Sequence, residues 1–242
     1  MLSQHGPFIK KRDFDDQPPY RLLDRVEYVC QSVAGKRALH VGCTNWPYSQ
    51  PSIDNGTLLH DRLLRRATSL VGLDPDAEGV DVLNRAGLGP VVVGDVEHVE
   101  RFEGHEAFSD KFDVIVLGEV IEHLNNPGLA LTGLKELLQP GGEIVVTTIN
   151  AYCAFRFAQY ALRGNGGRQE PVHPDHVAYY SPSTLALLAT RHGLRVTDIA
   201  FYNLGPEHRA FARRRIQIIN DIAMKFAPQL ADGLVLKLAV NT

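Results

Sequence analysis

Short apolar runs alternate with amphipathic segments along most of this chain. Five such runs, bounded by polar residues or glycine, lie at 38–41, 69–73, 91–93, 114–117 and 144–148. Their length and continuous apolar character are typical of strands buried on both faces. Between them, apolar residues recur at helical spacing. Strands that alternate with helices predict an α/β fold built on a doubly wound, mostly parallel sheet.

The pattern continues beyond residue 150 and defines the expected limits of the domain. Two further apolar runs predict a sheet of seven strands, and the helical segments between the runs complete a Rossmann-like layered fold. We expect one domain over 1–242, with an N-terminal helical arm at 1–35 and an insertion at 151–181. The insertion contains the sequence GNGG, so we expect a mobile lid. The other expected elements are strands at 194–202 and 234–240, a polar loop at 43–56, and helices at 57–67, 77–86, 127–138, 182–192 and 206–226.

Composition and charge narrow the class of protein. The 242 residues are 44% hydrophobic, which is ample for a core, and the net charge of −3 provides no basic field for nucleic acid or anionic membrane. The three cysteines are widely spaced, which argues against a disulfide framework and a cysteine zinc site. No apolar run is long enough to span a bilayer, and the N-terminus lacks the apolar stretch of a signal peptide. We therefore expect a cytoplasmic protein.

The clearest candidate for chemistry follows the central apolar run. Gly118 ends that run, and Glu119, Glu122 and His123 follow at offsets 0, +3 and +4. If the chain turns helical there, these three side chains share one face. The carboxyl end of a buried parallel strand is where open α/β sheets place their active sites. The segment 112–128 therefore predicts a site with two carboxylates and an imidazole.

The ends of the preceding strands suggest a nucleoside ligand. Gly42 closes the first strand, Asp74 the second and Asp95 the third. A carboxylate at the end of the second strand is positioned to accept hydrogen bonds from ribose hydroxyls. The simpler interpretation makes Asp74 and Asp95 turn formers only, since one precedes Pro75 and the other follows glycine. The strand–helix alternation favours the nucleoside interpretation.

Taken together, these segments resemble the class I S-adenosylmethionine-dependent methyltransferases. The resemblance covers about residues 36–200 through HVGC, LVGLDPD, VVVGDVE, FDVIVLGEVIEHL and LLQPGGEIVVTT. It implies S-adenosylmethionine as cofactor, with the methionine part near the first strand, the ribose on the second and the adenine beside the third. The implied cofactor-binding residues are His40, Gly42, Cys43, Asp74, Pro75, Asp95, Val96, Gly118 and Glu119. His40 stands where the family usually has an acid, and Thr44 and Trp46 stand where it has further glycines.

The segment EVIEHL, with a later Asp175-His176 pair, resembles two branches of that superfamily. These are the small-RNA terminal 2′-O-methyltransferases and the ubiquinone-biosynthesis O-methyltransferases. The first branch implies a divalent metal, Mg²⁺, Mn²⁺ or similar, held by Glu119, Glu122, His123 and His176. Such a metal lowers the pKa of a hydroxyl and orients it. The metal-free alternative makes His123 a general base, with Glu122 anchoring a loop.

These observations predict an S-adenosylmethionine-dependent O-methyltransferase. Its acceptor would be a hydroxyl of a small molecule or glycan, with His123 and Glu122 as catalytic residues and with or without a metal. One alternative is 2′-O-methylation of RNA 3′ ends, which the lack of a dedicated RNA-binding domain disfavours. The other is a methyltransferase-fold protein that binds without catalysis, which the clustered ionisable groups disfavour. The sequence assigns no oligomeric state.

Overall fold

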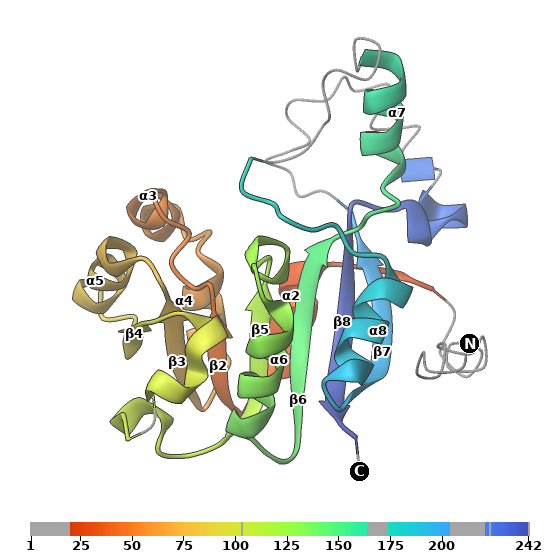
Figure 1. Ribbon diagram of the computed structural model, residues 1–242. Helices are drawn as coiled ribbons and strands as arrows, with labels where there is room; N and C mark the ends of the chain where they lie inside the picture. The colour runs from red at the N-terminus through yellow and green to blue at the C-terminus, as the bar shows by residue number, and fades with distance from the viewer. Residues whose placement is uncertain (1–19, 103, 164–173, 204–220, 223, 242) are drawn as a thin grey trace.

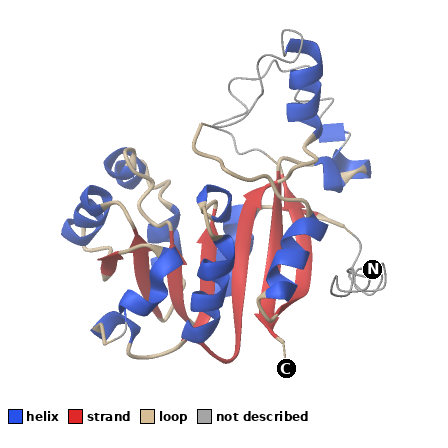
Figure 2. Ribbon diagram, in the orientation of Figure 1, coloured by secondary structure: helices blue, strands red, loops and turns tan. Residues whose placement is uncertain are grey.

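The computed structural model describes residues 20–102, 104–163, 174–203, 221–222 and 224–241. A mostly parallel sheet forms the centre, and helices cover both of its faces (Figures 1 and 2). The strand order is β1-β7-β8-β6-β5-β2-β3-β4, so the order reverses direction between β5 and β2. Strand β8 runs antiparallel to β6 and β7, and the other pairs are parallel. The doubly wound fold is confirmed.

Within the described residues the sheet has eight strands, one more than predicted. The strands are β1 (Leu22–Leu23), β2 (Arg37–Val41), β3 (Ser69–Asp74), β4 (Val91–Val93), β5 (Phe112–Gly118), β6 (Leu138–Ile149), β7 (Leu194–Tyr202) and β8 (Gly233–Val240). The additional strand is β1, which pairs with β7 where the sequence predicted a helix. Asp24 explains the difference, because its side chain accepts a hydrogen bond from the Glu27 amide and starts the helix after β1.

The helices divide between the two faces of the sheet. One face packs against α6 and α8, and the other against α2 and α4. The helices are α2 (Arg25–Val33), α3 (Ser49–Asp54), α4 (Leu59–Leu64), α5 (Ala77–Arg85), α6 (Pro127–Leu137), α7 (Ala154–Arg163) and α8 (Pro182–Arg191), with 3-10 turns η1 (Val96–Phe102), η2 (Glu106–Phe108), η3 (Ile121–His123) and η4 (Pro228–Leu230).

Three local predictions need correction. The segment 43–56 is not a plain loop, because it contains α3. Thr57 does not cap the next helix: its hydroxyl donates to the carbonyl of Ser52, and α4 begins after Leu58. The predicted strand 144–148 is also longer, since β6 begins directly where α6 ends.

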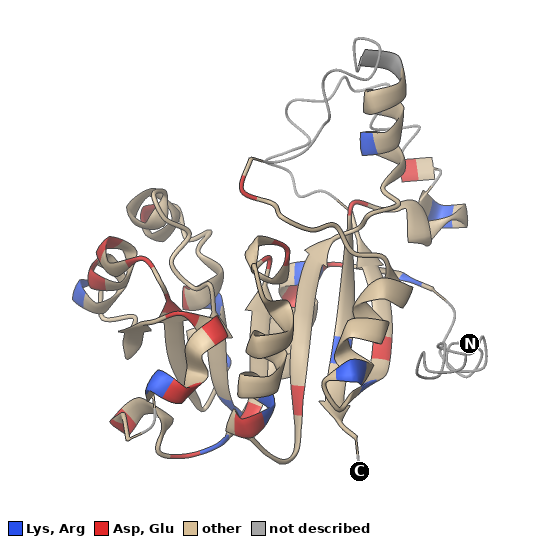
Figure 3. Cartoon of the chain, in the orientation of Figure 1, with Lys and Arg blue, Asp and Glu red and all other residues tan. Residues whose placement is uncertain are grey.

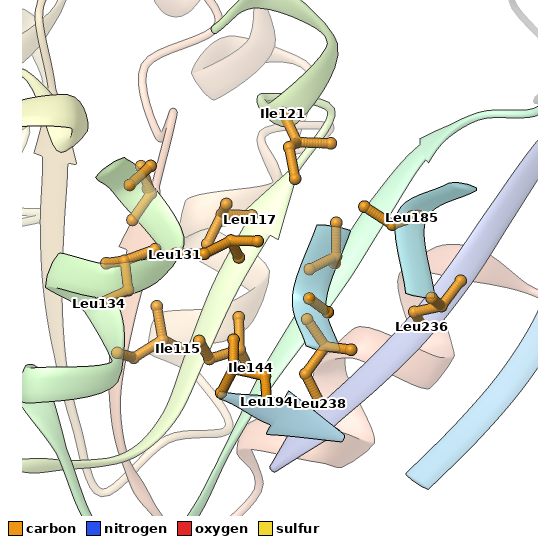
Figure 4. Close-up of a cluster of buried hydrophobic side chains, with 14 of the residues drawn as sticks. Ile115, Leu117, Ile121, Leu131, Leu134, Ile144, Leu185, Leu194, Leu236 and Leu238 are labelled. Carbon is orange, nitrogen blue, oxygen red and sulfur yellow. The ribbon is translucent and has the colours of Figure 1, made fainter. Parts of the chain in front are cut away.

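The largest core cluster anchors the carboxyl end of β5. Ile115 and Leu117 are fully buried between β6 and helix α6, where Leu131 and Leu134 cover them (Figure 4). Ile121, just beyond β5, is also fully buried in this cluster. Because Ile121 is held in the core, the turn that carries the predicted acidic residues has a fixed position above the strand.

Several predictions reach beyond the described residues. Residues 1–19 of the predicted arm and most of the predicted helix 206–226 lie outside them, as does the centre of the predicted lid at 164–173. Of that insertion, α7 rises past the carboxyl ends of the strands (Figure 1), and residues 174–180 return to the sheet. The lid stays a prediction. Among the described residues, none of the helices has the length and apolar character that a membrane span requires.

Candidate active site

The site lies where β2 and β5 end side by side, at the reversal of strand order. Gly42, just after β2, has a φ of +71° and donates its amide hydrogen to the carbonyl of Leu73. A Cβ at this position would lie 2.3 Å from Cγ2 of Val120, which follows β5. Only glycine therefore lets the turn after β2 approach the turn after β5 so closely.

Asp74 at the end of β3 is buried and organises the neighbouring turn. Its carboxylate accepts hydrogen bonds from the amides of Thr44 and Asp76, both at 3.0 Å. These bonds fix the orientation of the carboxylate between the first two strand ends, where a ribose was predicted. Pro75 beside it is exposed, and Cys43 is buried, which raises the pKa of its thiol.

The residues predicted to border the adenine lie in the next turn. Asp95 is exposed, and its carboxylate accepts a hydrogen bond from the Glu97 amide at 2.9 Å, so it does form a turn. Val96 is buried at the start of η1. The turn-forming role of Asp95 leaves its apolar neighbour as the more suitable surface for a flat base. Acidic residues follow the ends of both β3 and β5 (Figure 3).

His40, at the position where the family usually has an acid, contacts a second buried histidine. Its Nδ1 lies 3.1 Å from Nδ1 of His60 in α4, and the two buried rings are nearly parallel. His60 Nε2 in turn lies 3.0 Å from the carbonyl oxygen of Leu88. His40 Nε2 is 3.6 Å from the position of a Cβ on Gly118, at the end of β5. The imidazole thus reaches the region between β2 and β5.

Glu119 occupies a different position from the other two predicted site residues on this turn. The expected helix does not form: Glu119 has a φ of +59°, and only the 3-10 turn η3 follows. Its Oε1 accepts hydrogen bonds from Thr147 at 3.1 Å and from the hydroxyl of Tyr202. The two partners belong to β6 and β7, so Glu119 is held against the sheet.

Glu122 is fully buried and carries an unusual carboxyl group. One oxygen accepts a hydrogen bond from the Thr148 hydroxyl at 2.8 Å. The other, Oε1, is buried and has no hydrogen-bond partner among the described residues. Burial, together with the charge of Glu119, raises the pKa of Glu122 to about 8. The free group is therefore mostly protonated at neutral pH, and a cation beside it would reverse that preference.

His176 comes to Glu122 through the backbone of the insertion. The amides of Val177 and Ala178 donate to the Glu122 carbonyl, at 2.9 and 3.2 Å. The rings of His123 and His176 then meet edge to face, with centroids 4.6 Å apart. Ligand atoms of Glu122, His123 and His176 lie within 4.8 Å of one another, in a group that does not include Glu119.

The orientation of His123 comes from the same segment. Its Nδ1 lies 3.1 Å from the carbonyl oxygen of Asp175. A carbonyl only accepts, so Nδ1 carries the proton and Nε2 is the basic nitrogen. The backbone carbonyl of Asp175 therefore orients His123. A carboxyl group and two imidazoles in this arrangement can hold a cation or exchange a proton with a substrate hydroxyl.

Comparison with known proteins identifies the family. The family model described as a methyltransferase domain matches residues 19–199, about three quarters of the chain. The chain belongs to this methyltransferase family. The match contains β1 to β7 except the end of β7, and includes every predicted site residue.

Relatives and solved structures agree with the family. The chain is 26% identical to the ubiquinone biosynthesis O-methyltransferase of Aeromonas salmonicida, over 78% of this chain and 75% of the relative, and 28% identical to that of Hahella chejuensis, over 76% and 77%. A SAM-dependent methyltransferase of Archaeoglobus fulgidus superposes with a TM-score of 0.55 at 16% identity, covering 88% and 89% of the two chains. The magnesium protoporphyrin IX methyltransferase of Synechocystis with bound SAH gives 0.54 at 11%, covering 90% and 82%.

The predicted class is confirmed: the chain is an S-adenosylmethionine-dependent methyltransferase of the class I fold. Sequence reasoning missed three partners of the predicted site residues, namely His60, Thr148 and Tyr202. They contact His40, Glu122 and Glu119, respectively. None of them follows a strand that was predicted to carry the site. A histidine four residues before the end of a helix gives no sign that it meets His40. Tyr202, at the end of the strand predicted at 194–202, offered a weak signal.

Proposed function

We propose that this methyltransferase transfers the methyl group of S-adenosylmethionine to a hydroxyl of a small molecule or glycan, at Glu122, His123 and His176. The observation that carries the proposal is the convergence of these three side chains above β5, within 4.8 Å of one another. The relatives named ubiquinone biosynthesis O-methyltransferase support an oxygen acceptor. The reaction needs in-line alignment of sulfonium and hydroxyl, and a group that takes the hydroxyl proton.

The cofactor would lie across the ends of β2, β3 and β5. Asp74 would accept the ribose hydroxyls, Val96 would border the adenine, and Gly42 and Gly118 would leave room for the methionine part. Support comes from the fixed carboxylate of Asp74 and the close approach at Gly42. This placement puts the sulfonium side toward the turn that carries Glu122 and His123.

We further propose that a divalent metal assists the reaction. The residues present fit such an ion: Glu122 Oε1 is a buried oxygen without a hydrogen-bond partner among the described residues, and His123 presents Nε2 because Asp175 fixes Nδ1. Glu122, His123 and His176 would hold the metal, and Mn²⁺ or a similar ion suits this mixed set better than Mg²⁺. When bound, the ion would lower the pKa of the acceptor hydroxyl. Without it, His123 Nε2 would accept the proton directly.

Cofactor placement is tested by isothermal titration calorimetry with S-adenosylhomocysteine. Asp74→Ala should bind at least about tenfold more weakly than wild type, because two hydroxyl contacts to a carboxylate are lost. Asp81→Ala, an exposed residue of α5, is the matched control and should bind normally. Equal affinity of Asp74→Ala and wild type would refute the ribose assignment.

The metal is tested by chelation during methyl transfer to a catechol probe. EDTA should abolish transfer, Mn²⁺ should restore it, and His176→Ala should weaken Mn²⁺ binding while S-adenosylhomocysteine affinity stays normal. His105→Ala, an exposed histidine next to η2, is the control. Activity that survives complete chelation would leave His123 as a metal-free base. Transfer to RNA 3′ ends and not to catechols or sugars would favour the RNA alternative, which uses the same side chains.

A further inference from the structure

Two buried histidines below the cofactor region have no role in the reaction described above. His40 and His60 are 2% and 0% exposed, and their Nδ1 atoms lie 3.1 Å apart. His60 Nε2 lies 3.0 Å from the carbonyl oxygen of Leu88. His40 Nε2 is buried, and no described residue hydrogen-bonds to it. Leu88, His60 and His40 thus form a row of hydrogen-bond contacts that ends at His40 Nε2.

Hydrogen-bond chemistry determines which ring nitrogens of His40 and His60 carry a proton. The Leu88 carbonyl only accepts, so His60 Nε2 carries a proton. Burial lowers the pKa of both imidazoles, that of His60 to about 4, so each ring is neutral and has one proton. His60 Nδ1 is therefore a bare acceptor, and the 3.1 Å contact requires the proton on His40 Nδ1. The reverse arrangement would set the bare Nε2 of His60 against the carbonyl oxygen.

His40 Nε2, the last atom of this row of contacts, is consequently a hydrogen-bond acceptor. With its proton on Nδ1, His40 presents a lone pair at Nε2, 3.6 Å from the position of a Cβ on Gly118. The charge of Arg25 further disfavours a second proton on His40. A buried acceptor without a partner is unfavourable, so a hydrogen-bond donor at this point would be stabilised.

We propose that His60 fixes His40 as a neutral hydrogen-bond acceptor for the ammonium group of S-adenosylmethionine. His40 Nε2 then performs, without a negative charge, the function of the acid that usually stands at this position, and His60 is a positioning residue. The inference rests on the cofactor placement proposed above. Of the cofactor's groups, the ammonium is the donor that a lone pair between the ends of β2 and β5 would meet, because the ribose and adenine are assigned to the ends of β3 and β4.

Calorimetry with two ligands tests the proposal. S-Adenosylhomocysteine has the ammonium group, and 5′-methylthioadenosine lacks the amino-acid part. In His60→Leu the acceptor for His40 Nδ1–H is lost, and the His40 proton can move to Nε2. Affinity for S-adenosylhomocysteine should fall about tenfold, the equivalent of one hydrogen bond, while methylthioadenosine affinity should hold. His60→Gln, which retains both a donor and an acceptor, should bind like wild type. Equal losses for both ligands, or none, would overturn the proposal.

Nitrogen NMR of the wild-type histidines provides a test that needs no variant to fold. His40 should show a protonated Nδ1 and a bare Nε2, and its Nε2 resonance should move when S-adenosylhomocysteine binds but not with methylthioadenosine. A proton on Nε2, or an unmoved resonance in the S-adenosylhomocysteine complex, would refute the assignment. Asp74→Ala distinguishes this failure from a failure of cofactor placement, because it should weaken both ligands only if the placement holds.

Discussion

Gly42 offers the sharpest test of how the two halves of the site are held together. Replacing it with alanine introduces two separate costs. The first is the left-handed backbone, with φ at +71°, and the second is the contact of 2.3 Å between the new Cβ and Val120 Cγ2. Gly35→Ala serves to separate the two costs, because Gly35 has a φ of +68° but a Cβ there would meet no atom within 4 Å. This substitution therefore has the backbone cost alone.

The structure sets the expected magnitudes. A left-handed alanine costs about 1 kcal/mol, and we expect this loss of unfolding free energy in Gly35→Ala. In Gly42→Ala the β-branched Val120 must also move, which adds about 1–3 kcal/mol. Because Val120 lies between Glu119 and the η3 turn, its displacement also disturbs Glu122 and His123. Gly42→Ala should therefore bind S-adenosylhomocysteine more weakly, whereas Gly35→Ala should bind it normally.

Urea denaturation and calorimetry measure both effects. The double variant Gly42→Ala/Val120→Ala removes the contact and keeps the backbone strain, so a double-mutant cycle should return a favourable coupling of about 1–2 kcal/mol. If Gly42→Ala is no less stable than Gly35→Ala, or if Val120→Ala recovers nothing, the contact between the two turns does not restrict position 42. The reasoning given for this part of the site would then be wrong.

Two further predictions concern pH. The folded protein retains the Glu122 proton up to about pH 8, so stability is greatest below the ordinary carboxyl pKa of 4.5 and falls by up to about 1.4 kcal/mol per pH unit toward pH 8. Urea titrations at pH 5 and 8 should show that Glu122→Gln removes this fall in unfolding free energy. A variant whose unfolding free energy falls as much as that of wild type between the two pH values would contradict the prediction. Although burial opposes the effect, hydrogen bonds from Arg21 and Tyr28 lower the pKa of Asp198, so its stabilisation is present above the ordinary pKa and lost as pH falls through the lowered one. Asp198→Asn should cost about 1–2 kcal/mol at pH 7 and progressively less as pH falls below the ordinary carboxyl pKa of 3.8; a cost that does not change with pH would argue against the charge.

The local pattern was sufficient for the layered fold and for the strand ends to which the cofactor is assigned. Buried parallel strands need uninterrupted apolar runs, and the polar residue that ends each run lies at the same edge of the sheet. Asp74 and Gly42 could therefore be assigned to strand ends from the order of apolar and polar residues alone. The resemblance through HVGC and EVIEHL added the family, which the comparison confirmed.

The geometry around the acceptor side depended on contacts across the sheet. Helical spacing predicted one face for Glu119, Glu122 and His123, but the left-handed backbone at Glu119 turns its side chain toward Tyr202. Such a conformation is sparsely populated by residues other than glycine and persists only where the surroundings hold it, so periodicity cannot foresee it.

The same limit applies to the pairs that are distant along the chain. His40 meets His60, and Glu122 meets His176, through packing between elements that sequence spacing does not relate. Each side chain had a residue type suited to chemistry, yet its partner, its protonation and its exposure follow from burial in the folded protein. The order of residues established which groups were available at the strand ends. Packing of the folded chain selected which of them touch, because hydrogen bonds and pKa values depend on distances of a few ångströms.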